Sequence, residues 1–267
     1  MAVLSKLLIK EIEMKKIKYG IIGTGVMGRE HIRNIELIEN AEVVALCDSH
    51  EPSINSSLEI INNNVQVFQN HLELINANIV DAYIIATPNF THIDILKDIV
   101  QTKAHLLVEK PLCTTIDDCM EFKKLANGYP GVIWTAMEYR YMPPVARFIE
   151  EIHKGTIGNL KMLSIREHRF PFLVKVNDWN RFSKNSGGTL VEKCCHFFDL
   201  MRFITKSEVT SVFATGNQDN NHLDESYDGK TPDIIDNAFV VLDFDNGVRG
   251  SLDLCMLSLI HISEPTR

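Results

Sequence analysis

Two sets of residues, far apart in this 267-residue sequence, have the types and spacing that redox chemistry on an alcohol requires. Gly23, Gly25 and Gly28 lie in the run GTGVMG, which allows a tight turn, a close backbone approach to a pyrophosphate and close helix packing. Glu192 and His196 are four residues apart, so on one helix they would share a face, with the carboxylate orienting the imidazole. Together the two sets indicate hydride transfer to or from a dinucleotide, with a side chain that accepts the hydroxyl proton.

Asp48 is expected at the end of the second strand, where an acidic side chain would accept hydrogen bonds from the adenosine ribose. The following residues, Ser49-His50-Glu51, contain no arginine to neutralise a 2′-phosphate, so the sequence favours NAD and leaves NADP as the second choice. The alternative is that Asp48 is a solvated loop residue.

Two further segments are expected at the carboxyl ends of strands, where ligands of parallel α/β sheets bind. Thr87-Pro88-Asn89 follows one strand, although Asn89 alternatively caps the next helix. Lys110 follows another and precedes Pro111, which restricts Lys110 to extended backbone and fixes the direction of its side chain. The alternative for Lys110 is an ordinary surface lysine.

The elements that must position these residues alternate between strand and helix in the first half of the chain. Short apolar runs predict strands at Ile17–Ile22, Glu42–Cys47, Val65–Phe68, Val80–Ala86, His105–Val108 and Val132–Ala136. Helical periodicity predicts helices at Val26–Ile38, Thr91–Val100 and Ile116–Leu125. This alternation predicts a doubly wound parallel sheet of the Rossmann type.

The second half has a different pattern. It predicts helices at Val145–His153 and Thr189–Ile204, a polar stretch at Val176–Gly188, and strands at Lys161–His168, Val209–Ala214, Ala238–Phe244 and Val248–Leu254. Asp245-Asn246-Gly247 is a hairpin signal. We therefore expect an α+β domain on an open antiparallel sheet.

The predicted boundaries are a Rossmann domain at residues 15–137 and a substrate and dimerisation domain at residues 138–256. Residues 1–14 are interpreted as an extension, because Met14 itself is a plausible start. Residues 257–267 are interpreted as a non-native tail, because the run from about Ser258 resembles translated sequencing adapter; the second domain would then be truncated. A natural frayed C-terminus is the alternative.

Composition excludes several classes of protein. The 27 Lys and Arg against 35 Asp and Glu give a net charge of −8, which disfavours binding to nucleic acids and anionic membranes. No apolar run is long enough for a membrane span, and no secretory signal is present. The six cysteines have no framework or Cys-x-x-Cys spacing, which favours a reducing cytoplasmic compartment and no metal site.

Five motifs occur in a characteristic order: GIIGTGVMGREH, ATPNFTH, LLVEKPL, IHKGTIGNL and GGTLVEKCCHFFDLM. In this order and spacing the chain resembles the Gfo/Idh/MocA oxidoreductase family over about Lys15 to Met256. The resemblance implies an NAD(P)-binding Rossmann domain and oxidation or reduction of a sugar or a cyclitol such as inositol. It also implies a dimer or tetramer built through the open sheet.

The resemblance places the catalytic lysine at Lys110 and the catalytic histidine at His196, with Glu192 where the family usually has aspartate. Cofactor contacts would fall on Gly23, Gly25, Val26, Met27, Gly28, Asp48, Thr87, Pro88, Asn89, His92, Glu109 and Lys110. Candidate substrate contacts are Glu138, Arg140, Trp179 and Asn180. Glu138 stands where relatives often have asparagine.

The sequence thus predicts a cytoplasmic NAD(P)-dependent dehydrogenase acting on a polyhydroxylated small molecule, in a homo-oligomer. His196 would remove the hydroxyl proton while Lys110 holds the same oxygen. The alternative is a non-catalytic nucleotide sensor of the same fold, against which the presence of both Lys110 and His196 argues.

Overall fold

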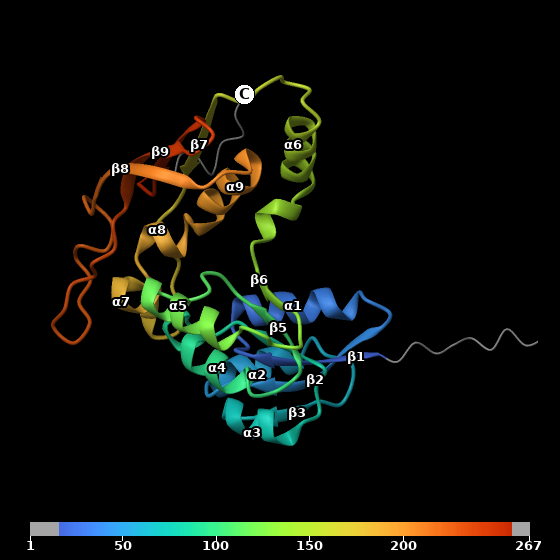
Figure 1. The fold of residues 1–267 in the computed structure, drawn as a ribbon. Helices are drawn as coiled ribbons and strands as arrows, with labels where there is room; N and C mark the ends of the chain where they lie inside the picture. The colour runs from blue at the N-terminus through green and yellow to red at the C-terminus, as the bar shows by residue number, and fades with distance from the viewer. Residues whose placement is uncertain (1–15, 258–267) are drawn as a thin grey trace, which may run out of the picture. The chain divides into compact units, whose positions relative to one another are not determined.

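The computed structural model describes residues 16–257 and is drawn in Figure 1. Its first sheet has six strands: β1 (Ile17–Ile22), β2 (Ala41–Cys47), β3 (Gln66–Phe68), β4 (Ala82–Ile85), β5 (His105–Val108) and β6 (Ile133–Thr135). Their order is β3-β2-β1-β4-β5-β6, with β1 parallel to both β2 and β4 and β2 parallel to β3. This is the doubly wound order, so the predicted Rossmann sheet is confirmed.

Helices connect these strands. They are α1 (Val26–Glu36), α2 (Glu51–Leu58), α3 (His71–Ala77), η1 (Asn89–Thr91), α4 (His92–Ile99) and α5 (Ile116–Leu125). Helix α5 has the predicted bounds, and its ends explain why: the Thr115 side chain accepts from Asp118 N, acidic residues occupy the first turn and lysines the last. Periodicity predicts neither α2 nor α3, since neither helix has a sustained apolar stripe.

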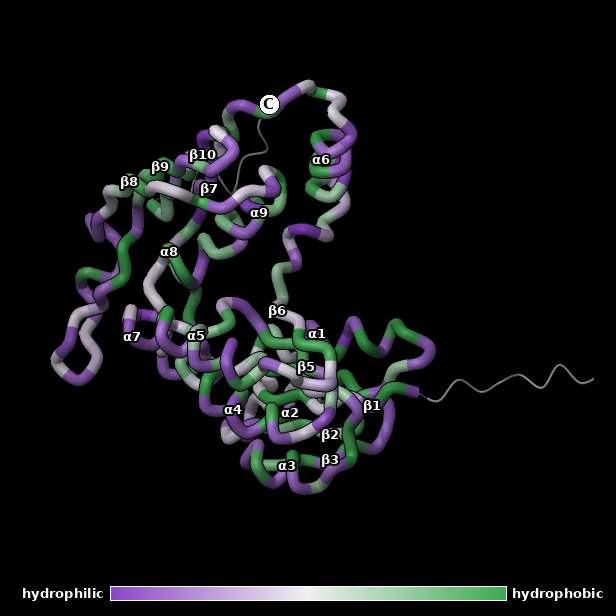
Figure 2. The backbone as a smooth tube through the Cα atoms, in the orientation of Figure 1, coloured by the Kyte–Doolittle hydropathy of each residue, from purple (hydrophilic) through white to green (hydrophobic). Residues whose placement is uncertain are grey.

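Strand β4 and the second half of β1, in the middle of this sheet, are buried on both faces, as is typical of parallel sheets. All four residues of β4 are buried, and Ile21 and Ile22 of β1 are at most 2% exposed. Burial of each such isoleucine contributes about 1.5–3 kcal/mol of hydrophobic stabilisation. The hydropathy of the chain can be followed in Figure 2.

The second half contains a four-stranded sheet. Its strands are β7 (Met162–His168), β8 (Val209–Asn217), β9 (Asn237–Phe244) and β10 (Arg249–Cys255), in the order β7-β10-β9-β8. The helices of this half are η2 (Glu138–Tyr141), α6 (Pro143–His153), η3 (Val176–Arg181), α7 (Ser183–Ser186), α8 (Thr189–Glu192) and α9 (Cys195–Thr205).

The core of this half lies between α9, α6 and one face of the sheet. Strand β9 alternates strictly, with Ala238, Val240, Leu242 and Phe244 buried and the residues between them facing away. These four pack in one cluster with the apolar residues of α9, such as Met201. The alternation is what a half-buried strand requires.

The expectation of an antiparallel sheet was wrong for one pair of strands. Strand β10 is antiparallel to β9 but parallel to β7, so the sheet is mixed. A parallel pairing needs a long crossover connection, and the segment between β7 and β10 contains four helices and two strands. The predicted hairpin does join β9 to β10, with Gly247 at φ 80°.

The predicted helix Thr189–Ile204 is two helices. Helix α8 ends at Glu192 and α9 begins at Cys195. The polar stretch before it contains two short helices, η3 and α7, that the sequence does not predict.

Contacts divide the chain into two compact units. The first runs to Ala86 and includes Ala104–Leu106, and the second is Thr87–Lys103 with the residues from Leu107 on. The predicted domain boundary near residue 137 stays a prediction. The predicted extension at residues 1–14 and the predicted tail from Ser258 lie outside the described residues.

Candidate active site

The Lys110 side chain is held by Glu192. Lys110 lies just after the buried end of β5, and its Nζ donates to the Glu192 carbonyl oxygen at 2.9 Å and lies 3.4 Å from Glu192 Oε1. Both side chains are largely buried, at 16% and 8% exposure. Burial alone would lower the pKa of Lys110, but the nearby Glu192, Cys195 and Glu109 together outweigh it and the pKa is raised. Lys110 is therefore a charged donor at neutral pH, with a third N–H available to a ligand.

Asn89 completes this group. Its amide nitrogen donates to Glu192 Oε2 and to the Ser186 carbonyl oxygen, the latter at 3.0 Å. The sequence-based alternative that Asn89 is only a helix cap is not what the structure has, since the cap of η1 is Pro88, without a side-chain bond. Asn89 thus fixes the carboxylate that in turn fixes Lys110.

His92 holds the two loops that carry these residues. Its Nδ1 lies 2.9 Å from the Pro111 carbonyl oxygen and its Nε2 lies 3.1 Å from the Thr87 carbonyl oxygen. The ring is 0% exposed, and burial lowers its pKa. His92 thus joins the segment that carries Thr87 to the segment that carries Lys110.

His196 lies at the start of α9 and faces a different carboxylate from the one predicted. Its Nε2 is 3.4 Å from Glu138 Oε1, and its ring stacks on Tyr139 with centroids 4.1 Å apart. Burial, and then repulsion from Lys110, lowers the pKa of His196 to about 4. The imidazole is therefore neutral at pH 7.

The predicted pairing of Glu192 with His196 is corrected by these contacts. The Glu192 carboxylate bonds Lys110 and Asn89, and the Nε2 contact of His196 is with Glu138. The physical reason is the break between α8 and α9: the i, i+4 argument holds only where the helix is continuous.

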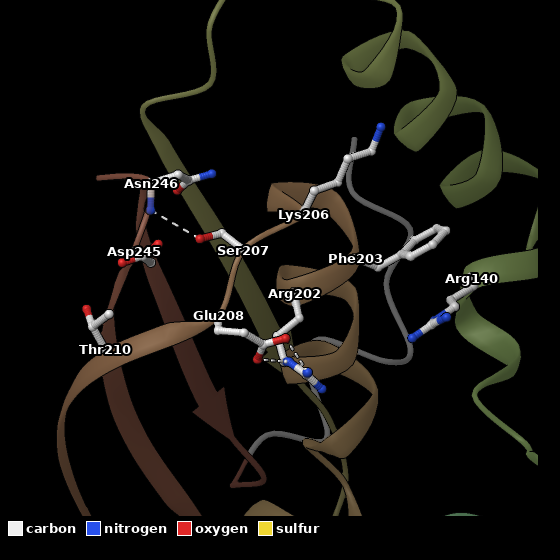
Figure 3. A pocket seen from close by; sticks show the side chains of 9 residues that line it. All are labelled: Arg140, Arg202, Phe203, Lys206, Ser207, Glu208, Thr210, Asp245 and Asn246. Carbon is white, nitrogen blue, oxygen red and sulfur yellow. Dashed lines mark hydrogen bonds and ion pairs between the residues drawn. The ribbon is translucent and has the colours of Figure 1, made fainter.

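The predicted substrate contacts have different surroundings. Arg140 forms a two-pronged ion pair with Asp199 and lies over the Phe203 ring, at the side of a pocket of about 690 Å³ (Figure 3). Asn180 is 1% exposed, and its amide donates to the Leu173 carbonyl oxygen. Both side chains are thus occupied by protein partners.

The other two candidates present more surface. The Trp179 ring meets Phe90 edge-on, with centroids 6.5 Å apart, and Phe90 is itself exposed. Glu138 is 49% exposed beside His196. Trp179 and Glu138 therefore remain the better candidates for contact with a substrate.

The glycine-rich loop lies in the other unit and has the geometry of a phosphate cradle. Gly23 has φ 94°, and a Cβ on Gly28 would lie 2.0 Å from the Gly23 carbonyl oxygen, so both positions need glycine. A Cβ on Gly25 would meet nothing within 4 Å, which leaves space above the N-terminus of α1. Val26 and Met27 in the first turn are exposed. This loop fits a dinucleotide pyrophosphate.

Asp48 supports that loop directly. Its Oδ2 accepts from Thr24 N at 2.7 Å and from Thr24 Oγ1 at 3.0 Å, and its Oδ1 accepts from His50 N at 2.9 Å. Each carboxylate oxygen has further lone-pair capacity for a ribose hydroxyl. The alternative of a merely solvated Asp48 is excluded by these bonds.

Three residues of the site were missed from the sequence: Tyr139, which stacks on His196, Asp199, which holds Arg140, and Lys193, whose charge contributes to the low pKa of His196. Asp199 follows His196 by three residues, a spacing that could have suggested a shared helix face. The position of Tyr139 depends on tertiary packing and has no local signal.

Comparison with known proteins agrees with this geometry. Residues 17–136 match an oxidoreductase family described as NAD-binding Rossmann fold, and residues 149–264 match the C-terminal alpha/beta domain of the same family. The protein is therefore an oxidoreductase with an NAD-binding Rossmann domain followed by an α/β domain. The chain belongs to the Gfo/Idh/MocA oxidoreductase family.

Several relatives are dehydrogenases or oxidoreductases. The chain is 28% identical to the rhizopine catabolism protein MocA of Rhizobium meliloti over 74% of this chain and 60% of that protein. It is 28% identical to the myo-inositol 2-dehydrogenase of Thermotoga maritima, over 89% of this chain and 68% of that protein. The crystal structure of a probable dehydrogenase from Thermotoga maritima has 27% identity and a TM-score of 0.77, covering 91% of this chain and 70% of that one. The chain therefore spans only about 60–68% of the length of these two curated relatives.

Proposed function

We propose that this chain belongs to an NAD-dependent dehydrogenase that transfers a hydride between nicotinamide and a CH–OH group of a sugar or cyclitol. The observation that carries the proposal is a charged Lys110, fixed by Glu192, together with a neutral His196 whose pKa is lowered by burial and then by Lys110. A cation and a neutral base beside each other are what alcohol oxidation requires.

The two side chains have separate roles in this proposal. The Lys110 ammonium donates to the substrate oxygen and stabilises the negative charge that develops as the O–H proton leaves. His196 accepts that proton at its unprotonated ring nitrogen, and Glu138 beside Nε2 favours the imidazolium that forms. Nicotinamide, when bound, accepts the hydride or returns it.

The positioning residues support the same arrangement. Glu192 and Asn89 hold Lys110, while Tyr139 stacks on the His196 ring and limits its rotation. The polyhydroxylated substrate class is supported by the relatives, which include a myo-inositol 2-dehydrogenase and a rhizopine catabolism protein.

The test is steady-state kinetics of the protein with NAD and a panel of cyclitols and aldoses, followed by NADH formation. We expect Lys110→Met and His196→Asn each to lower kcat by roughly 10² to 10⁴, with NAD affinity within a few fold of wild type. The matched control is Lys184→Met, because Lys184 is an exposed lysine on α7 of the same unit. Near-wild-type turnover in the Lys110 or His196 variant would contradict the assigned roles.

A further inference from the structure

Three more cations lie in the same unit as Lys110, and one of them, Lys193, is close enough to repel the other two and Lys110. Arg169 follows β7, Lys175 precedes η3, and Lys193 lies between α8 and α9, directly after Glu192. The Lys193 ammonium lies 5.3 Å from the centre of the Phe172 ring. Because Phe172 is midway between Arg169 and Lys175 in one short segment, Lys193 is packed against the stretch that carries the other two cations.

These charges repel one another across a partly buried space. Burial, followed by repulsion from Arg169 and Lys110, lowers the pKa of Lys193 to about 8; Lys175 also contributes to the repulsion, and Glu192 opposes it. Burial and then repulsion from Lys110 lower the pKa of Lys175 as well, against attraction by Glu192 and Glu109. The protein thus maintains like charges close together at an energetic cost.

The protein's own carboxylates satisfy only part of this charge. Lys110 pairs with Glu192, and Arg169 Nη1 pairs with Glu167 at 3.1 Å. Among residues 16–257, no carboxylate forms an ion pair with the ammonium of Lys175 or Lys193. Arg169 Nε is buried and has no hydrogen-bond partner there. A buried guanidinium N–H without a partner is costly, so a ligand acceptor would relieve it.

We propose that the substrate carries an anionic group, a carboxylate or a phosphate, which binds Lys193, Lys175 and Arg169 Nε beside Lys110. The inference rests on the proposed function, since it assigns the substrate class of the same site. The substrate is then a polyhydroxylated acid or a phosphate ester rather than a neutral polyol. Lys193, Lys175 and Arg169 determine substrate specificity by binding the anionic group, while Lys110 and His196 act on the hydroxyl group.

The test is calorimetric titration of the protein, saturated with NADH, with matched pairs of ligands at pH 7. The acids are D-gluconate, D-glucuronate and D-glucose 6-phosphate, and the neutral partners are D-glucose and myo-inositol. We expect at least one acid to bind tenfold or more tightly than the neutral compounds. The carboxylates and the phosphate ester distinguish the two sources of anionic charge.

Lys193→Met should narrow the preference for that acid by at least tenfold, and Lys175→Met is the second variant if the first one folds poorly. Lys184→Met, the exposed lysine, is the control and should retain the preference. Wild-type affinity for the acid should fall as the pH rises from 7 to 9, because Lys193 loses its charge near pH 8. This pH dependence should be absent in Lys193→Met.

The proposal is overturned if no acid binds more tightly than the neutral compounds, or if Lys193→Met and Lys175→Met both keep the wild-type preference. Turnover measured in parallel distinguishes failure of the anion-site proposal from failure of the proposed dehydrogenase function. If an acid binds through Lys193 but no NADH-linked turnover is found, the proposed dehydrogenase function is contradicted while the proposed anion site stands. Turnover of neutral polyols in preference to acids contradicts the anion site alone.

Discussion

At the scale of single residues, the site depends on one side chain staying charged and its neighbour staying neutral. The pKa of His196 falls from 6.5 to about 4 through burial and Lys110. A histidine with a depressed pKa stabilises the fold fully above pH 6.5. That stability decreases as the pH falls toward 4, because the unfolded chain takes up the proton first.

We expect the His196 ring to titrate with a midpoint near 4 in NMR spectra of the folded protein, with its signal assigned from His196→Asn. Lys110→Met should raise this midpoint, because it removes the neighbouring positive charge. Lys184→Met should leave it unchanged. A wild-type midpoint at or above 6.5 would show that His196 is not desolvated as described.

A second prediction at this scale concerns the choice of cofactor. Asp48 should repel a 2′-phosphate, so the protein should bind NAD more tightly than NADP, and Asp48→Asn should reduce the difference by about 1–3 kcal/mol. Fluorescence titration with both cofactors measures it. Because Asp48 also holds Thr24, Thr24→Val is the control: it removes the hydroxyl bond, keeps the charge, and should weaken both cofactors alike. Equal affinities of the wild-type protein for NAD and NADP would contradict the role assigned to Asp48.

At the scale of elements, local patterns predicted what local forces determine. Helical periodicity predicts the bounds of α5, with which its cap and end charges agree, and the short apolar runs predict the six strands of the first sheet within one or two residues at most ends. The break between Glu192 and Cys195 had no local signal, so the sequence predicted one helix and, from it, the wrong partner for Glu192.

Contacts between distant segments could not be read from the sequence. The Glu192 contact with Lys110 joins residues 82 positions apart, and its contact with Asn89 joins residues 103 apart. Likewise, the parallel pairing of β7 with β10 follows from packing across a long crossover. Periodicity specifies which face of a strand is buried but not which strand lies beside it.

The glycine-rich turn allows a prediction that separates folding from binding. Gly28→Ala would place a Cβ 2.0 Å from the Gly23 carbonyl oxygen, so we expect the free energy of unfolding to fall by roughly 1–3 kcal/mol. Gly25→Ala meets nothing within 4 Å and has φ −65°, so stability should stay within about 0.5 kcal/mol.

Gly25→Ala should nevertheless weaken NAD binding by tenfold or more, because the new methyl group takes the space that the pyrophosphate approaches. Urea unfolding and NAD titration of both variants provide the two measurements. If Gly25→Ala binds NAD like wild type, the cradle is not at this turn.

At the scale of the whole molecule, the second sheet has one face that no helix of the described chain covers. Phe213 of β8 and Phe239 of β9 are 70% and 61% exposed, and Phe213 is paired with the exposed Val241. Charges of both signs flank this apolar stripe, in the pairs Arg166–Asp253 and Arg249–Asp243.

Within residues 16–257, none of the helices has the length and apolar composition of a membrane span.

A face with an apolar centre and charges of both signs is complementary to a second copy of itself under two-fold symmetry. We therefore expect the protein to be a homodimer or a larger homo-oligomer by size-exclusion chromatography with light scattering. Phe213→Glu combined with Phe239→Glu should give a monomer, because each buried carboxylate would lack a partner. Leu37→Glu, at an exposed leucine at the end of α1, should keep the wild-type mass. A monomeric wild type at micromolar concentrations, or a double variant of unchanged mass, would show that the subunits do not associate through this face.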